Sequence, residues 1–321
     1  MLKTKMTEIL GIKYPIQCGT MQALSRAELV SAVANAGGLA CIPAATFPTK
    51  PELLDEIKKT RDMTDQPFGV NVSLFPALMP QPPEEMIGTV IEAGVKILET
   101  AGRSPAPYRE MITDAGLIHI HKCARVRDAV KVDGLGVDMV SIVGTECGGH
   151  PSMECVTTMV LVPQAVDNIS RPLIAGGGFS DGRSLLAALS MGAAGVNMGT
   201  RFMATKECPM PDSVKEKMVA SPETETVLVM QSIQNPARAL RTPWTEKILE
   251  MEGQGATLDD LIPYITGEAA KGGWHVGDVD KGILPVGQAI GRVKDIPTVA
   301  EFVERTVNEA MSMKGTLDTI F

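Results

Sequence analysis

The sequence predicts an α/β protein folded as a (β/α)8 TIM barrel, and two observations favour this fold class. Short apolar runs alternate with amphipathic segments through the first two-thirds of the chain, and eight such runs can be counted. Several amphipathic segments end in a glycine that can stop a helix before the next run. Eight alternating units fit a closed barrel better than an open doubly wound sheet, which usually has about five or six strands.

The apolar runs are predicted to be the strands of the barrel. Each run is short and apolar on both faces, as expected for parallel strands that are covered on both sides. The predicted strands are residues 14–18, 38–43, 68–74, 95–100, 117–123, 138–144, 172–178 and 194–202.

The segments between these runs are predicted to be helices. Ser25 can cap the first helix, and Gly37 and Gly38 can end it. Pro51 stands at the second position of the next helix, where proline is tolerated. The predicted helices are residues 25–38, 50–63, 83–94, 107–116, 125–136, 157–169 and 181–193.

The alternation stops near residue 208. We expect residues 209–275 to form a mostly helical cap that contributes to a substrate cleft. Residues 1–208 and 276–321 would then form the barrel. The amphipathic pattern of residues 298–317 predicts a C-terminal helix that packs back on the barrel.

Composition narrows the class of protein. The chain has 321 residues, 44% of them hydrophobic, and a net charge of −8, which argues against a basic face for nucleic acid. No apolar run reaches the roughly 18 residues of a membrane span, and the N-terminus lacks a signal-peptide core, so a cytoplasmic location is expected. The six cysteines form no C-x-x-C pair and the four histidines no i, i+4 pair, so we expect reduced thiols and no metal site.

Glycines follow the last two predicted strands, where many barrels bind phosphate. Gly176, Gly177 and Gly178 follow the seventh strand, and Gly199 and Thr200 follow the eighth. Glycines allow backbone N–H groups to approach a ligand closely, and a following helix points its positive end at an anion. These positions predict a phosphate site; the alternative interpretation is that the glycines only make tight turns.

Polar residues end three other strands. Gln22 follows the first strand, Asn71 lies in the third and Lys122 ends the fifth. Amide side chains can hydrogen-bond the edge of a planar ring, and a cation beside an electron-accepting ring stabilises its reduced, anionic form. For Lys122 the alternative is an ordinary surface lysine at a strand end.

The stretch "ECGGHP" ends the sixth strand and contains the candidate catalytic residue. Gly148 and Gly149 would let the backbone pass close to a flat cofactor, and His150 would then project into the cavity. A histidine in that place can act as a general acid or base near neutral pH, or orient an anion. The alternative is a loop histidine without a catalytic role.

Several motifs together resemble one family. The chain is similar to the nitronate monooxygenase superfamily (formerly 2-nitropropane dioxygenases), mainly over residues 7–208. Within this superfamily the chain most resembles the NADH:quinone reductase branch, on "MQ…RAE", "ETAG", "HKC", "GHP" and "TKECP". The motifs that carry the family resemblance are "GTMQ", "ANAGGLA", "PFGVNVSL", "HKC", "ECGGHP", "AGGGFSDGRSLLAAL" and "GAAGVNMGTRFMATKEC".

The resemblance implies a TIM barrel that binds FMN without a metal. His150 matches the family's active-site histidine. Thr20 stands where many relatives have Gly, and Gly176 stands where some have Ser. The implied phosphate contacts are Gly177, Gly178, Gly199 and Thr200, and the implied ring contacts are Met21, Gln22, Asn71, Lys122, Gly148 and Gly149.

The function that the sequence favours is hydride transfer from NADH or NADPH to a quinone-type acceptor through FMN. Three alternatives stay open: a nitronate monooxygenase that uses O2, an enoyl-thioester reductase, and a non-catalytic flavin-binding protein. Arg238 and Arg241 of the cap could meet the phosphates of a dinucleotide. The partners expected are a small-molecule substrate and, as a candidate, a second copy of the chain in a homodimer, with no nucleic acid and no membrane span.

Overall fold

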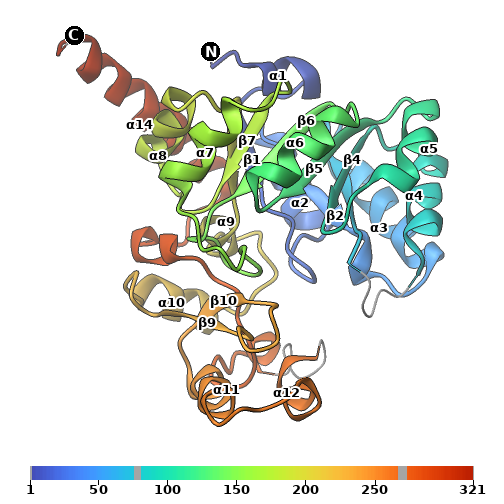
Figure 1. Cartoon of the computed structure of the whole chain (residues 1–321). Helices are drawn as coiled ribbons and strands as arrows, with labels where there is room; N and C mark the ends of the chain where they lie inside the picture. Colours follow the sequence, from blue (N-terminus) through green and yellow to red (C-terminus); the bar gives the residue numbers. More distant parts are fainter. Residues whose placement is uncertain (1, 76–80, 267–272, 321) are drawn as a thin grey trace.

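The computed structural model describes residues 2–75, 81–266 and 273–320, and its central element is a barrel of eight parallel strands (Figure 1). Hydrogen bonding runs in the order β1-β8-β7-β6-β5-β4-β3-β2. Cys18 N–H donates to the carbonyl of Leu39 and Leu39 N–H to that of Ile16, so the first strand also meets the chain just before the second. All eight predicted strands are confirmed. They are β1 Ile16–Cys18, β2 Cys41–Pro43, β3 Gly69–Ser73, β4 Ile97–Ala101, β5 Ile118–Cys123, β6 Met139–Val143, β7 Leu173–Gly176 and β8 Gly195–Met198.

Helices surround the barrel, and the seven predicted between strands are present. Side-chain caps begin two of them: Thr49 and Glu52 form a capping box at α3, and Asp181 and Ser184 form one at α8. None of the helices in the described ranges is long and apolar enough to cross a membrane. The barrel helices are α2 Ala27–Asn35, α3 Lys50–Met63, α4 Pro83–Glu92, α5 Arg109–Asp114, α6 Val126–Gly134, α7 Thr158–Val166, α8 Gly182–Ser190 and the short α9 Thr200–Met203.

A short N-terminal helix, α1 (Lys5–Leu10), closes the end of the barrel at which the strands begin. Its buried Met6 and Leu10 join a small apolar cluster with inward-facing strand residues such as Ile97 and Ile174. Figure 1 shows α1 at one end of the barrel and the segment after α9 at the other. The carboxyl ends of the strands, where barrel enzymes bind their ligands, therefore face that segment.

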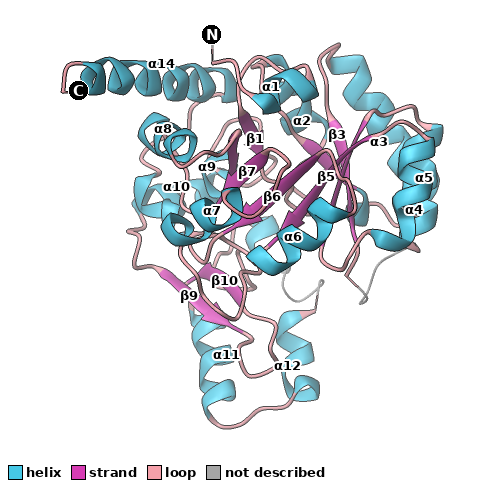
Figure 2. Cartoon of the chain, turned by 45° about the horizontal axis from the view of Figure 1, so that its top comes forward, coloured by secondary structure: helices cyan, strands magenta, loops and turns pink. Residues whose placement is uncertain are grey.

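The segment after the barrel contains a small sheet as well as helices. Its helices are α10 (Asp212–Ala220), α11 (Pro243–Gly253) and α12 (Leu258–Ile265), while β9 (Thr226–Val229) and β10 (Ala237–Leu240) pair antiparallel. Figure 2 shows this sheet between the barrel and helices α11 and α12. The expectation of a mostly helical cap missed the sheet, which buries its apolar side chains in a core of its own. Residues 267–272 lie outside the described part of the chain, and the division into barrel and cap remains a prediction.

The C-terminal helix α14 (Val299–Asp318) confirms the expected amphipathic helix and packs on α8. Gly182 opens α8 against it, and its N–H donates to the Glu309 carboxylate at 2.8 Å. A Cβ at Gly182 would overlap backbone atoms of Thr306 and Ala310, so no side chain fits between the two helices.

We therefore expect Gly182→Ala to lower the free energy of unfolding by about 1–3 kcal/mol, the usual cost of overpacking. Gly134→Ala is the matched control, because a Cβ at Gly134, also in a helix, would meet no atom within 4 Å. Urea unfolding of both variants measures the difference. Equal midpoints for the two variants would contradict the close contact between α8 and α14.

Candidate active site

The layer of side chains nearest the open end of the barrel is polar, and Glu99 lies at its centre. The Glu99 carboxylate accepts hydrogen bonds from Gln17 Nε2 at 2.7 Å, Asn71 Nδ2 at 2.7 Å and Thr20 Oγ1 at 2.8 Å. The Lys122 ammonium lies 3.1 Å from the same carboxylate. These side chains come from β1 and the residues just after it, β3, β4 and β5, so the barrel itself brings them together.

The electrostatics of this cluster favour an ionised carboxylate. Glu99 is fully buried, and burial alone would raise its pKa. The Lys122 ammonium and the hydrogen bonds from Thr20 and Gln17 outweigh burial and hold the pKa of Glu99 below its ordinary value. A buried charge pair of this kind is stable only when its remaining hydrogen bonds are made, as they are here.

Two polar atoms in the same layer have no partner. Among the described residues, neither Gln17 Oε1 nor Ser141 Oγ makes a hydrogen bond, although both atoms are buried. Ser141 lies opposite Lys122 in the register between β5 and β6. Since buried polar groups are almost always satisfied, these two atoms are suited to hydrogen-bond a polar ligand or water.

The two glycine segments predicted to bind phosphate lie side by side. Gly176 ends β7, which pairs with β8, and Gly199 precedes α9 directly after β8. Gly177 and Gly178 have positive φ values of 97° and 81°, which glycine adopts without strain. The hydrogen bonds made between described residues use none of the N–H groups of Gly177, Gly178 and Gly199.

Space at these glycines differs in an informative way. A Cβ at Gly177 would crowd Thr158 and the backbone of Gly144, so glycine there serves chain packing. A Cβ at Gly199 would meet nothing within 4 Å. The buried Thr200 hydroxyl accepts a hydrogen bond from Gly287 N–H at 2.8 Å, so it anchors the 287 segment beside the glycines.

The loop after β6 is clamped to the segment beyond the barrel. A Cβ at Gly148 would lie 2.7–2.8 Å from the backbone of Val286 and Gly287, so this glycine accommodates protein rather than open space. Gly149, with φ of 79°, exchanges two backbone hydrogen bonds with Arg238 of β10. The two glycines of "ECGGHP" therefore join two distant parts of the chain.

His150 follows this clamp and lies exposed on the rim of the barrel. Its Nδ1 lies 3.1 Å from the carbonyl oxygen of Pro236, so Nδ1 carries the hydrogen and Nε2 is left as the basic nitrogen. Although the ring is exposed, the protein around it still desolvates it and lowers its pKa, against a smaller opposing effect of the Pro236 carbonyl. The ring of Phe75 lies 6.3 Å from the imidazole, centre to centre.

The first strand contributes differently from expectation. Gln22 is exposed, and its amide reaches only the Ala45 carbonyl at 3.5 Å, while Met21 is half-buried. Thr20, the position that departs from many relatives, instead provides the hydroxyl that binds Glu99. The sequence did not indicate Glu99, Gln17 or Thr20 as site residues. Glu99 could have been found, because side chains two residues apart on a strand share a face and Ile97 faces the barrel interior.

The two arginines considered for dinucleotide phosphates are already engaged. Arg238 is buried, and its guanidinium donates to the Thr145 carbonyl at 3.0 Å and to the Thr226 hydroxyl at 3.1 Å. Arg241 forms an ion pair with Glu246. Arg238 therefore fixes the loop after β6 instead of offering a free cation to a ligand.

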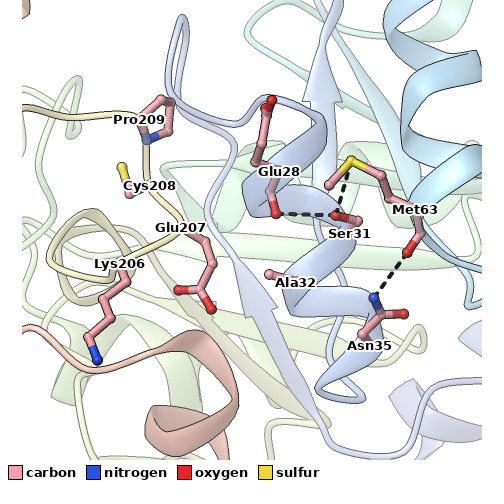
Figure 3. Close-up of a pocket in the computed structure, with 9 residues that line it drawn as sticks. All are labelled: Glu28, Ser31, Ala32, Asn35, Met63, Lys206, Glu207, Cys208 and Pro209. Carbon is pink, nitrogen blue, oxygen red and sulfur yellow. Dashed lines mark hydrogen bonds between the residues drawn. The ribbon is translucent and has the colours of Figure 1, made fainter.

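Within residues 2–75, 81–266 and 273–320, no group of three or more His, Cys, Asp or Glu side chains is arranged to hold a metal ion. A surface pocket of about 610 Å³ lies between α2 and residues 206–209 (Figure 3), and none of the predicted site residues lines it.

Comparisons with known proteins place these features in context. A family model described as nitronate monooxygenase matches residues 3–309. A Mycobacterium tuberculosis protein named (3aS,4S,5R,7aS)-5-hydroxy-7a-methyl-1-oxo-octahydro-1H-indene-4-carboxyl-CoA dehydrogenase is 33% identical over 97% of both chains. A probable nitronate monooxygenase of Staphylococcus haemolyticus is 33% identical over 78% of this chain and 81% of its own.

Solved structures extend the similarity to the fold. FabK from Thermotoga maritima superposes over the whole of both chains with a TM-score of 0.93 and 31% identity. A nitroalkane oxidase from Streptomyces ansochromogenes covers 98% of this chain with a TM-score of 0.83. Its sequence identity is 23%, so this second match indicates a shared fold only.

Proposed function

Because this chain belongs to the nitronate monooxygenase family of flavin-dependent oxidoreductases, we propose that it binds FMN at the barrel mouth and passes hydride from NAD(P)H to an unsaturated acyl thioester. The similarity to a carboxyl-CoA dehydrogenase over 97% of both chains carries the choice of substrate class. The whole-chain match to FabK supports a shared architecture. In the reaction, NAD(P)H and a proton reduce the carbon–carbon double bond next to the thioester carbonyl.

The residues at the barrel mouth fit FMN. FMN, when bound, supplies a ring that accepts hydride from the nicotinamide and delivers it to the acceptor. The N–H groups of Gly177, Gly178 and Gly199, which donate to no described residue, are suited to its phosphate. Asn71 and Lys122 lie in the layer below and are suited to the polar edge of the ring.

His150 is suited to supply the proton. Its Nδ1 is held by the Pro236 carbonyl, and its exposed ring can take up a proton from water after each turnover. The imidazolium would then give that proton to the carbon beside the thioester carbonyl. An open rim also accommodates a substrate attached to a long carrier.

The phosphate site can be tested without measuring activity. We expect Gly199→Ala to lower the amount of FMN that stays bound, because the added Cβ would point into space that no described atom occupies. Stability should be unchanged for the same reason. Gly253→Ala is the control, since its Cβ would also meet nothing within 4 Å but lies at the end of α11. Dialysis followed by flavin absorbance gives the occupancy; full FMN retention by Gly199→Ala would count against this phosphate position.

A second candidate keeps the hydride donor and replaces the thioester with a quinone, the acceptor that the sequence favoured. The exposed ring of Phe75 beside His150 supports this candidate, because an apolar aromatic face on the rim can stack with a flat quinone. A nitronate monooxygenase is the third candidate, and it is supported by the family match and by relatives of that name.

Anaerobic rapid mixing distinguishes the candidates. The purified protein is mixed separately with NADH, NADPH and propionate 3-nitronate while the flavin absorbance is followed, and reduced samples then receive crotonyl-CoA or benzoquinone. We expect bleaching by a nicotinamide and recovery with crotonyl-CoA. Recovery with benzoquinone alone would support the quinone reductase. A response to the nitronate alone would support the monooxygenase, and no response to any donor would support a non-catalytic flavin-binding protein.

A further inference from the structure

We propose that Glu99 is a positioning residue that fixes the Lys122 ammonium and offsets its charge, so that the pair, rather than Lys122 alone, sets the reduction potential of the bound flavin. The inference rests on the proposed FMN site but not on the identity of the electron acceptor. It assigns a role to a residue that lies outside the glycine segments and the His150 loop.

The geometry restrains Glu99 on every side. Gln17 donates to one carboxylate oxygen, while Thr20 and Asn71 donate to the other. Lys122 approaches that second oxygen at 3.1 Å. A carboxylate held by three neutral donors has little freedom to rotate, so the lysine paired with it is held in one place as well.

The exposure of the two partners indicates which one faces a ligand. The Glu99 side chain has no exposed surface, whereas 21% of the Lys122 side chain is exposed toward the mouth. Glu99 therefore lies behind Lys122 as seen from the open end of the barrel. It acts on a ligand through Lys122 and through its field, without touching the ligand.

Charge determines the direction of the effect. A nearby cation stabilises the more negative, reduced form of a flavin and raises its potential, while an anion lowers it. With both charges present, the flavin meets a partly compensated pair. Removing the negative charge leaves an uncompensated cation, and removing the positive charge leaves an uncompensated anion.

The experiment compares the wild-type holoenzyme with E99Q, K122M and the double variant E99Q/K122M. Each protein is reconstituted with FMN, and its midpoint potential is measured by equilibration with a reference dye. We expect E99Q to shift the potential upward, K122M to shift it downward, and the double variant to lie between them. E56Q is the matched control, because buried Glu56 also pairs with an arginine, at 2.9 Å, but outside the barrel mouth. It should keep the wild-type potential.

Two outcomes overturn the proposal. One is an E99Q potential equal to that of the wild type despite retained FMN, which would leave Glu99 a purely structural residue. The other is the same potential for K122M and the double variant. That second comparison decides the matter even if E99Q fails to fold, because the double variant leaves no buried charge without a partner.

A different result would contradict the proposed function without deciding the role of Glu99. A wild-type protein that binds FMN but accepts hydride from neither NADH nor NADPH contradicts the proposed reaction, yet the four potentials still judge Glu99. A wild-type protein that takes up no FMN overturns both the proposed function and this inference.

Discussion

His150→Ala is expected to lower turnover of the enoyl thioester by about 100- to 10,000-fold, the usual contribution of a general acid, while FMN stays bound. The imidazole lies exposed on the rim, whereas the glycine segments suited to the cofactor are on other strands. The clamp between Gly149 and Arg238 uses backbone atoms only, so alanine at position 150 leaves it intact.

The measurement pairs steady-state rates with flavin absorbance of the dialysed variant. Met153→Ala is the control, because Met153 is an exposed residue of the same loop. It should keep the wild-type rate. The role assigned to His150 is contradicted if FMN is lost from His150→Ala, or if turnover falls less than about tenfold.

The barrel could be predicted from the sequence because its signal is local. Each strand is a short apolar run, and most helices between the strands carry a side-chain cap or a glycine stop, so neighbouring residues largely determine both. The sheet of β9 and β10 gave no such signal. Val227 and Val229 alternate over only four residues, and the strand finds its partner across a turn in which Met230 and Gln234 take positive φ values.

The site was predictable where it depends on strand ends and not where it depends on long-range packing. Lys122, next to the last residue of β5, lies in the polar layer as its position suggested, and Asn71, in the middle of β3, lies there too. Glu99 was missed because a single acid in the run of residues 95–100 resembles a strand end. Its inward direction follows only once Ile97 and Ile120 are known to face the barrel interior.

The loop glycines illustrate the limit of local inference. The sequence suggested that Gly148 and Gly149 make room for a cofactor. Gly148 packs against residues 286–287, and Gly149 bonds Arg238, both far away along the chain. A glycine indicates either the close approach of another residue or a positive φ, but the sequence does not identify the residue that approaches.

The surroundings of the two histidines of β5 could not be predicted from the sequence either, and they affect the stability of the fold. The spacing of His119 and His121 on β5 argued only against a helical metal pair. Both rings are buried and share the Thr100 hydroxyl, each with a ring nitrogen 2.7 Å from its oxygen. Arg109 donates to His119 Nδ1 at 2.8 Å.

This chain of hydrogen bonds has one consistent direction. Because arginine can only donate, His119 Nδ1 must accept, so His119 Nε2 carries the hydrogen and donates to Thr100. The Thr100 hydroxyl then donates to His121 Nδ1. Both histidines are neutral in this arrangement, and a proton on either Nδ1 would break it.

Acid should therefore destabilise the fold well above the pKa of its carboxylates. Desolvation by burial, reinforced by Arg109, lowers the pKa of His119 to about 3. Desolvation also lowers the pKa of His121 to about 4, against the opposing charges of Glu99 and Asp128. The unfolded chain takes up protons near pH 6.5, the ordinary value for histidine, while the folded chain does not.

The sign and window follow from these values. The stability contributed by neutral imidazoles is fully present above pH 6.5 and is lost as pH falls toward the folded-state pKa values. Between pH 6.5 and 5 the stability contributed by each ring falls by about 2 kcal/mol, or about 4 kcal/mol for both, which is a large share of the 5–15 kcal/mol typical of a domain.

Urea unfolding at pH 7 and pH 5 measures this loss. His121→Asn keeps an acceptor for Thr100 and should halve the pH dependence, although the variant is less stable at pH 7. A free energy of unfolding that stays constant from pH 7 to pH 5 in the wild type would show that the two histidines are not buried as neutral groups.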